Sequence, residues 1–223
     1  MAAAVDKAYS AIRDGIASGQ FSSGTHLTAQ NLASATGLSR TPVREAMRRL
    51  HAEGLIEFIP HRGAFVRQLG EREIYKIYDL IILLESHGAE AAAQNATQDQ
   101  INEMQDLVQR MEELIQRGAS ASEVAEYNGR FHRLVVAAAH NSWLEAAFRV
   151  IIDVPQVMNT FHAYQPDELR RSQIQHQELM LAIGSRDATW ARAIMESHVM
   201  AARNVLIRAD ARDKAAKGFI NGF

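Results

Sequence analysis

Hydrophobic residues near the start of the chain recur every three or four positions, at Tyr9, Ile12 and Ile16. That spacing predicts a helix over residues 4–18 with a single buried face. A polar stretch containing glycine follows as a turn, and Thr28 is placed to cap a second, shorter helix. The chain is therefore expected to open with two helices.

A third helix is predicted over the segment SRTPVREAMRRLHAEG, in which Ser39 stands at the capping position. Its buried stripe is formed by Val43, Met47 and Leu50. Two short apolar runs, LIEFI and AFV, then flank the turn PHRG and predict a hairpin. The order of helix, helix-turn-helix and hairpin is that of a winged helix-turn-helix.

The outward face of the third helix carries arginines at a spacing of four, Arg40, Arg44 and Arg48. An arginine near the start of a helix that enters the major groove can donate two hydrogen bonds to guanine, or bind phosphate. Arg62, at the tip of the hairpin, has the position of a wing contact to DNA. The alternative is an ordinary solvated basic helix face, which the complete order of elements disfavours.

The rest of the chain shows only helical periodicity. Six helices are predicted, over residues 71–95, 98–117, 122–140, 143–161, 167–184 and 187–208. They predict an antiparallel helical bundle, so the fold class is mainly α with a small winged hairpin. The domains are thus expected at 1–70 for DNA binding and 71–208 for the bundle. The tail 209–223 mixes charge with Gly and Phe and is expected to be partly loose or packed on a partner.

Length and composition agree with two globular domains. The chain has 223 residues, of which 47% are apolar and 22% charged. The absence of cysteine excludes disulfides and thiolate metal sites. No stretch approaches the ~18 consecutive apolar residues of a membrane span, and the first residues do not read as a signal peptide. A cytoplasmic protein with no membrane partner is expected.

Charge is distributed unevenly along the chain. Residues 1–70 contain eight Lys or Arg and five Asp or Glu, a net charge of +3, whereas the whole chain carries −2. The remainder therefore carries −5. A small basic module joined to a larger acidic one places nucleic-acid contact in the first.

Three histidines of the bundle form a candidate metal site. Asn128 and His132 are four residues apart, so both can face one point inside the bundle. His176 and His198 each lie beside an apolar helical stripe. Neutral imidazoles that converge suit a first-row divalent metal, although a lone histidine in a bundle is more often a structural core residue.

The segment SRTPVREAMRRLHAEGLIEFIPHRGAFV resembles the DNA-binding signature of GntR-type bacterial transcription regulators, over about residues 5–68. The resemblance implies a homodimer that reads a palindromic double-stranded DNA operator. It implies that DNA is contacted by Ser39, Arg40, Thr41, Arg44 and Gly63. The charge pattern adds Arg48 and Arg62 to this set.

The pattern NGRFH followed by His176 and His198 is similar to the ligand-binding domain of the FadR-like branch of these regulators, in its shorter, six-helix subgroup. The resemblance implies that Asn128, His132, His176 and His198 hold Zn²⁺, Ni²⁺ or Mn²⁺. Aspartate is commoner at the position of Asn128. Loss of that anionic ligand should lower the metal affinity, so the metal can be absent from the purified protein.

The same resemblance bears on the effector. Relatives often carry an arginine at the position of Ile81, whereas Glu85 is retained here. Arg130 or Arg133 is an alternative cation for an effector carboxylate. Because three histidines and an amide leave the ion at +2 with open positions, a small organic acid is the expected effector.

These features predict a ligand-responsive transcription regulator, most often a repressor in this family, that an organic acid releases from DNA. One alternative is an architectural DNA-binding dimer without an effector. A metalloenzyme is a further alternative. It is disfavoured because the nearest acid, Glu178, lies on a different helix face from His176. The protein is therefore not expected to be an enzyme.

Overall fold

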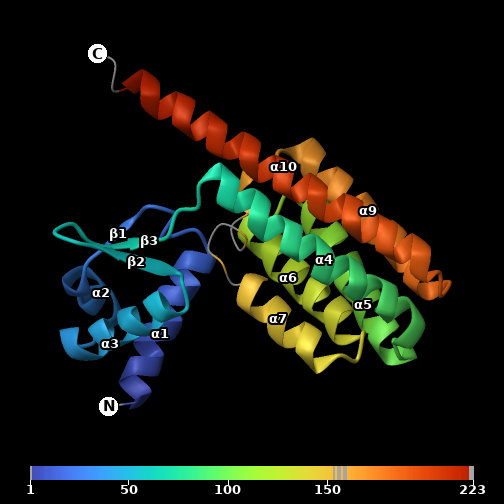
Figure 1. Cartoon of the computed structure of the whole chain (residues 1–223), viewed down its shortest axis with the longest axis horizontal. Coiled ribbons are helices and arrows are strands. Elements are labelled where there is room, and N and C mark those ends of the chain that lie inside the picture. The colour runs from blue at the N-terminus through green and yellow to red at the C-terminus, as the bar shows by residue number, and fades with distance from the viewer. Residues whose placement is uncertain (1, 153, 155–156, 158–159, 221–223) are drawn as a thin grey trace. The chain divides into compact units, whose positions relative to one another are not determined.

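The computed structural model describes residues 2–152, 154, 157 and 160–220. Two compact units are present, and the chain passes from one to the other after Leu69. The first contains short helices and a small sheet, and the second is helical (Figure 1). The mainly α fold class predicted from the sequence is confirmed.

The first unit has the order of elements of a winged helix-turn-helix. Its helices are α1 (Ala2–Ala17), α2 (Ala29–Thr36) and α3 (Arg40–Ala52). Its antiparallel sheet, in the order β1-β3-β2, comprises β1 (His26–Leu27), β2 (Ile56–Ile59) and β3 (Gly63–Val66). The predicted hairpin is β2 and β3. The turn expected before Thr28 contains β1, whose two residues pair with Phe65 and Ala64 of β3.

The core of this unit follows the predicted stripes. Ile12 and Ile16 from α1 and Val43 and Leu50 from α3 are completely buried. Thr28 caps α2, because its hydroxyl accepts a hydrogen bond from the Asn31 backbone N–H at 3.2 Å. Ser39 stands at the N-cap of α3, as predicted, but its side chain makes no capping hydrogen bond. Its hydroxyl is exposed at the start of the helix.

The second unit is built around α4 (Glu71–Asn95), which packs against α6, α7, α9 and α10. The remaining elements are α5 (Gln98–Gln116), α6 (Ala121–Ala137), α7 (Ser142–Ile152), the 3-10 helix η1 (Thr160–Ala163), α9 (Pro166–Gly184) and α10 (Ala188–Ile220). Figure 1 shows α10 as a long helix beside α4 and α9.

Two predicted boundaries of this unit were wrong. The helix expected over 143–161 ends at Ile152, and η1 follows at Thr160. The last predicted helix ends at residue 208, whereas α10 continues as far as Ile220 through the tail that was expected to be partly loose or packed on a partner; residues 221–223 lie outside the described part. The segment ADARDKAAK is rich in good helix formers, so the backbone has no reason to leave the helix at residue 209.

The helix starts of this unit carry the predicted caps. Thr97 and Ser120 each form a capping box, with Gln100 and Glu123 respectively. Asp187 accepts a hydrogen bond from the Trp190 backbone N–H at 2.9 Å. Among the described residues, every helix is too short or too polar to cross a lipid bilayer.

Candidate metal centre and nucleic-acid interface

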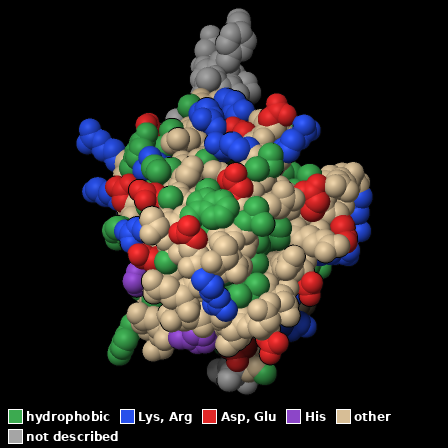
Figure 2. All heavy atoms as spheres, turned by 90° about the vertical axis from the view of Figure 1, so that its right-hand side faces the viewer, with side chains coloured by type: hydrophobic (Ala, Val, Ile, Leu, Met, Phe, Trp, Pro, Cys, Tyr) green, Lys and Arg blue, Asp and Glu red, His purple; other side chains and the backbone are tan. Residues whose placement is uncertain are grey.

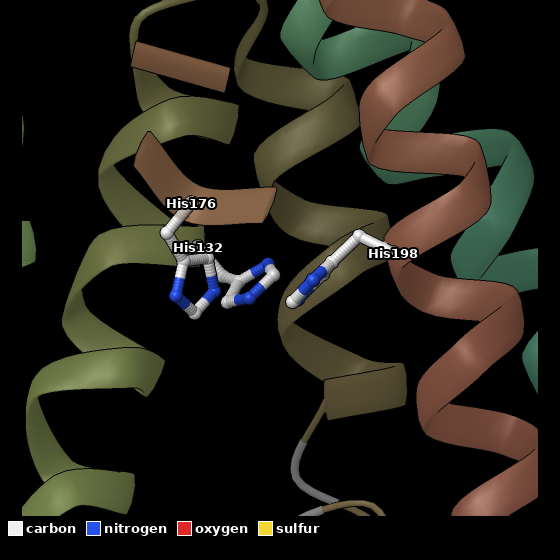
Figure 3. Close-up of side chains that lie close together, drawn as sticks. All are labelled: His132, His176 and His198. Atoms are coloured by element: carbon white, nitrogen blue, oxygen red, sulfur yellow. The ribbon is translucent and has the colours of Figure 1, made fainter. Parts of the chain in front are cut away.

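Three helices each bring one histidine to the same buried point: His132 from α6, His176 from α9 and His198 from α10. One ring nitrogen from each lies within 4.8 Å of the others. The three residues are only 6%, 1% and 5% exposed, respectively. Figure 3 shows the three rings turned toward one another. The structure thus brings together the histidines that the sequence singled out.

Several polar atoms of His176, His198 and Asn128 lack partners within the described part of the chain. Both ring nitrogens of His176, Nδ1 of His198 and Oδ1 of Asn128 are buried without a hydrogen bond. Asn128 lies one helical turn before His132 on α6. Because buried polar groups are normally hydrogen-bonded, this group of unused lone pairs fits a metal ligand set.

The electrostatic surroundings keep two of these imidazoles neutral. Burial lowers the pKa of His176 well below its ordinary value, and the neighbouring His198 and His132 lower it further. Burial also lowers the pKa of His198, with His132 and Arg171 adding to the effect. Since imidazole must be neutral to coordinate an ion, both side chains are in the state that metal binding requires.

Glu85 lies against His132 rather than in open space. The carboxylate projects from α4, is 2% exposed and accepts a hydrogen bond from Nδ1 of His132. Glu85 was predicted to contact the effector, and that prediction stays open; the structure shows its carboxylate in contact with a candidate metal ligand. Arg130 and Arg133, also assigned to the effector, are exposed and stand on other faces of α6 than His132.

A second buried polar contact escaped the sequence analysis. The hydroxyls of Tyr78 and Thr160 are 2.8 Å apart, and both residues are buried. Burial raises the pKa of Tyr78, so its hydroxyl stays neutral. Tyr78 precedes Glu85 by seven residues and therefore shares its face of α4. The seven-residue spacing between Tyr78 and Glu85 could have identified Tyr78 from the sequence.

The candidate DNA-binding face lies on α3 and the hairpin. Arg40, Arg44 and Arg48 are exposed, opposite the buried stripe of α3, and Arg48 forms an ion pair with Glu45 at 3.2 Å. Between α3 and the sheet, Arg44 and Arg48 line a hollow of about 410 Å³. Thr41, Arg62 and Gly63 are also exposed. By contrast, the side of the helical unit in Figure 2 carries both signs of charge intermixed around a hydrophobic group.

Gly63 is required at its position for two reasons. Its φ of +100° lies in the region that favours glycine, and an added Cβ would stand 2.7 Å from Nε2 of His26. We expect Gly63→Ala to lower the free energy of unfolding of this unit by about 1–3 kcal/mol. Urea denaturation checks this, with Gly184→Ala as a control because a Cβ there would meet no atom within 4 Å. Equal losses in both variants would contradict the assignment.

Comparison with known proteins identifies both units. The family model "Bacterial regulatory proteins, gntR family" matches residues 4–66, and the "FCD domain" model matches residues 76–201. The "Probable D-xylose utilization operon transcriptional repressor" of Paenarthrobacter nicotinovorans is 31% identical over 188 residues, which cover 83% of this chain and 81% of the relative.

Other relatives align over shorter stretches. The "Uncharacterized HTH-type transcriptional regulator YdhC" of Bacillus subtilis is 28% identical over 66% of this chain and 65% of its own length. The chain thus spans slightly less than two thirds of that relative. Among solved structures, E. coli McbR/YncC has a TM-score of 0.78 at 22% identity, over 92% of this chain and 97% of that chain. That likeness shows a shared fold.

Proposed function

The chain belongs to the gntR family of bacterial regulatory proteins and carries an FCD domain, and on this premise we propose how it senses its signal. It is a DNA-binding transcription regulator and not an enzyme. In our proposal it is a repressor that binds a palindromic operator as a homodimer. A small organic acid, bound beside a divalent metal ion in the FCD domain, releases it from the operator.

One observation carries the proposal. Three buried imidazoles converge, and the buried Oδ1 atom of Asn128, one helical turn before His132 on α6, has no hydrogen-bond partner in the described structure. Asn128, His132, His176 and His198 would hold the ion. A bound divalent ion would supply positive charge and open coordination positions for a small carboxylate. The convergence also disfavours a bundle that serves only for dimerisation.

Release from DNA requires that the effector bind two states of the protein unequally. The ligand candidates come from α6, α9 and α10, and Glu85 connects α4 to the same point through His132. An acid bound there would contact or adjoin four packed helices. A shift in their packing is therefore the change by which the FCD domain would favour the released state.

The proposal is tested by measuring melting temperature against small organic acids, with and without Zn²⁺. An acid present at a concentration 100 times its Kd should raise the free energy of unfolding by about 2.7 kcal/mol, and should do so only in the metal-loaded protein. The same acid should lower operator affinity in a gel-shift titration. Stabilisation of equal size in chelator-treated protein would contradict a role for the metal.

The proposed dimer has a candidate contact surface on α4 and α7, two helices that pack together. Large apolar side chains are exposed there: Leu80 by 50%, Leu83 by 60%, Trp143 by 84% and Val150 by 75%. A second copy of the chain would remove these side chains from water, which favours association. Two-fold pairing through this surface would supply the two winged helix-turn-helix units that a palindromic operator needs.

We expect the protein to sediment as a dimer at micromolar concentration without DNA. Leu83→Glu should shift the equilibrium toward monomer, because it would bury a charge in the contact. Leu181→Glu is the matched control, since Leu181 is 64% exposed but lies on α9, outside the proposed surface. A monomeric parent, or equal dissociation of both variants, would contradict this surface.

A further inference from the structure

We propose that Glu85 is a positioning residue of the metal centre. Its carboxylate fixes His132 so that Nε2 is free to coordinate, and it supplies the negative charge that Asn128 does not bring. The inference rests on the metal site proposed above. It makes Glu85 the partner of a metal ligand and not a ligand itself.

The location of Glu85 is unusual for a carboxylate. It occupies a core position of α4, in line with Ile74, Tyr78 and Ile81, which are all at most 2% exposed. A charge at such a position is disfavoured unless it is paired and hydrogen-bonded. The partner that the structure provides is Nδ1 of His132, which is itself buried. The buried position of Glu85 is therefore explained by its hydrogen bond to this histidine.

The hydrogen bond decides which nitrogen of His132 can bind a metal. With the carboxylate oxygen of Glu85 as the acceptor, Nδ1 of His132 is the nitrogen that carries the proton in this contact. Nε2 is then left with its lone pair. Histidine ligands of metals commonly donate their other N–H to a carboxylate, which fixes the ring and raises the basicity of the coordinating nitrogen. The contact between Glu85 and His132 matches this arrangement.

Charge gives Glu85 a second role. As metal ligands, three imidazoles and the amide of Asn128 would all be neutral, so these four ligand candidates would leave the charge of a divalent ion uncompensated. Glu85 stands directly behind one of the imidazoles, in a buried site where charges interact more strongly than in water. A carboxylate at residue 128 and a carboxylate at residue 85 should therefore partly substitute for one another in metal affinity.

The experiment compares Zn²⁺ affinity, measured against a competing chelator, for the parent and four variants of the full chain. Glu85→Leu removes charge and acceptor, and should weaken Zn²⁺ binding by about 10–100-fold. Glu85→Gln keeps an acceptor and should lose less. Adding Asn128→Asp to Glu85→Gln should recover most of that loss. Glu90→Gln is the control, because Glu90 is on the same helix but pairs with Arg192 at 2.6 Å.

A second readout needs no metal. Two-bond ¹H–¹⁵N correlation spectra of the chelator-treated parent should show His132 with its proton on Nδ1, assigned by the loss of that signal in His132→Gln. Glu85→Leu should shift the ring toward the Nε2–H form, which a merely structural effect on the helix would not do. An Nε2–H form in the parent would overturn the inference even if Glu85 variants fold poorly.

The two proposals fail in different ways. A parent that binds no Zn²⁺ contradicts the metal centre itself, while the His132 spectrum still tests the positioning by Glu85. A parent that binds Zn²⁺ as tightly as Glu85→Leu leaves the metal centre standing and overturns the role of Glu85. If the double variant bound Zn²⁺ no more tightly than Glu85→Gln, a carboxylate at residue 128 could not substitute for the one at residue 85.

Discussion

Arg44→Ala and Arg40→Ala are each expected to weaken binding to the specific operator by roughly 5- to 150-fold. The range corresponds to the loss of about 1–3 kcal/mol from one bidentate contact with guanine. Both arginines are exposed on α3, and Arg44 also lines the hollow between this helix and the sheet. Fluorescence anisotropy with operator and unrelated duplexes measures the effect, and circular dichroism checks that the fold is kept.

Arg49→Ala provides the matched control for these variants. It removes the same charge from the same helix, but its guanidinium faces α1, where it lies 3.9 Å from the centre of the Tyr9 ring. A base contact should affect the operator more than unrelated DNA. A phosphate contact should weaken both alike and reduce the salt slope by about one. Operator affinity equal to the parent's in Arg40→Ala and Arg44→Ala would refute the recognition-helix assignment.

The winged unit could be predicted because its signals are local. The stripe of Val43, Met47 and Leu50 specifies α3, and the two apolar runs around PHRG specify β2 and β3. Strand β1 could not be predicted in this way. Its two residues, His26 and Leu27, are too few to show alternation, and their extended backbone depends on pairing with β3, almost forty positions further along.

In the candidate metal centre, too, only part of the arrangement could be predicted from local spacing. Asn128 and His132 share a helix, so their spacing predicts that they face one point. The meeting of three helices at that point followed from the family resemblance. The contact of Glu85 with His132 joins residues 47 positions apart, so helical spacing alone could not reveal it. The spacing of Arg130 did predict its position: it is two residues from His132, so its side chain lies on the opposite face of α6.

His132→Ala is expected to cause the largest loss of metal binding. Removing a ligand should cost more than the roughly 10–100-fold that follows loss of a group hydrogen-bonded to a ligand. The variant also leaves Glu85 buried without the hydrogen bond that His132 provides, so its fold must be checked by circular dichroism. Metal content by elemental analysis and Zn²⁺ titration measure the effect. His87→Ala is the control, because His87 is exposed on α4.

Asn128→Asp should have the opposite effect and tighten Zn²⁺ binding, since it turns a neutral amide oxygen into an anionic one in a partly buried site. The Oδ1 atom of Asn128 is buried and has no hydrogen-bond partner among the described residues, so a bound ion would give the new carboxylate its partner. Operator release by an organic acid should be lost in His132→Ala and retained in Asn128→Asp. Equal metal content and affinity in the parent and both variants would show that these side chains are core polar groups, and an effector bound through the metal would then have no support.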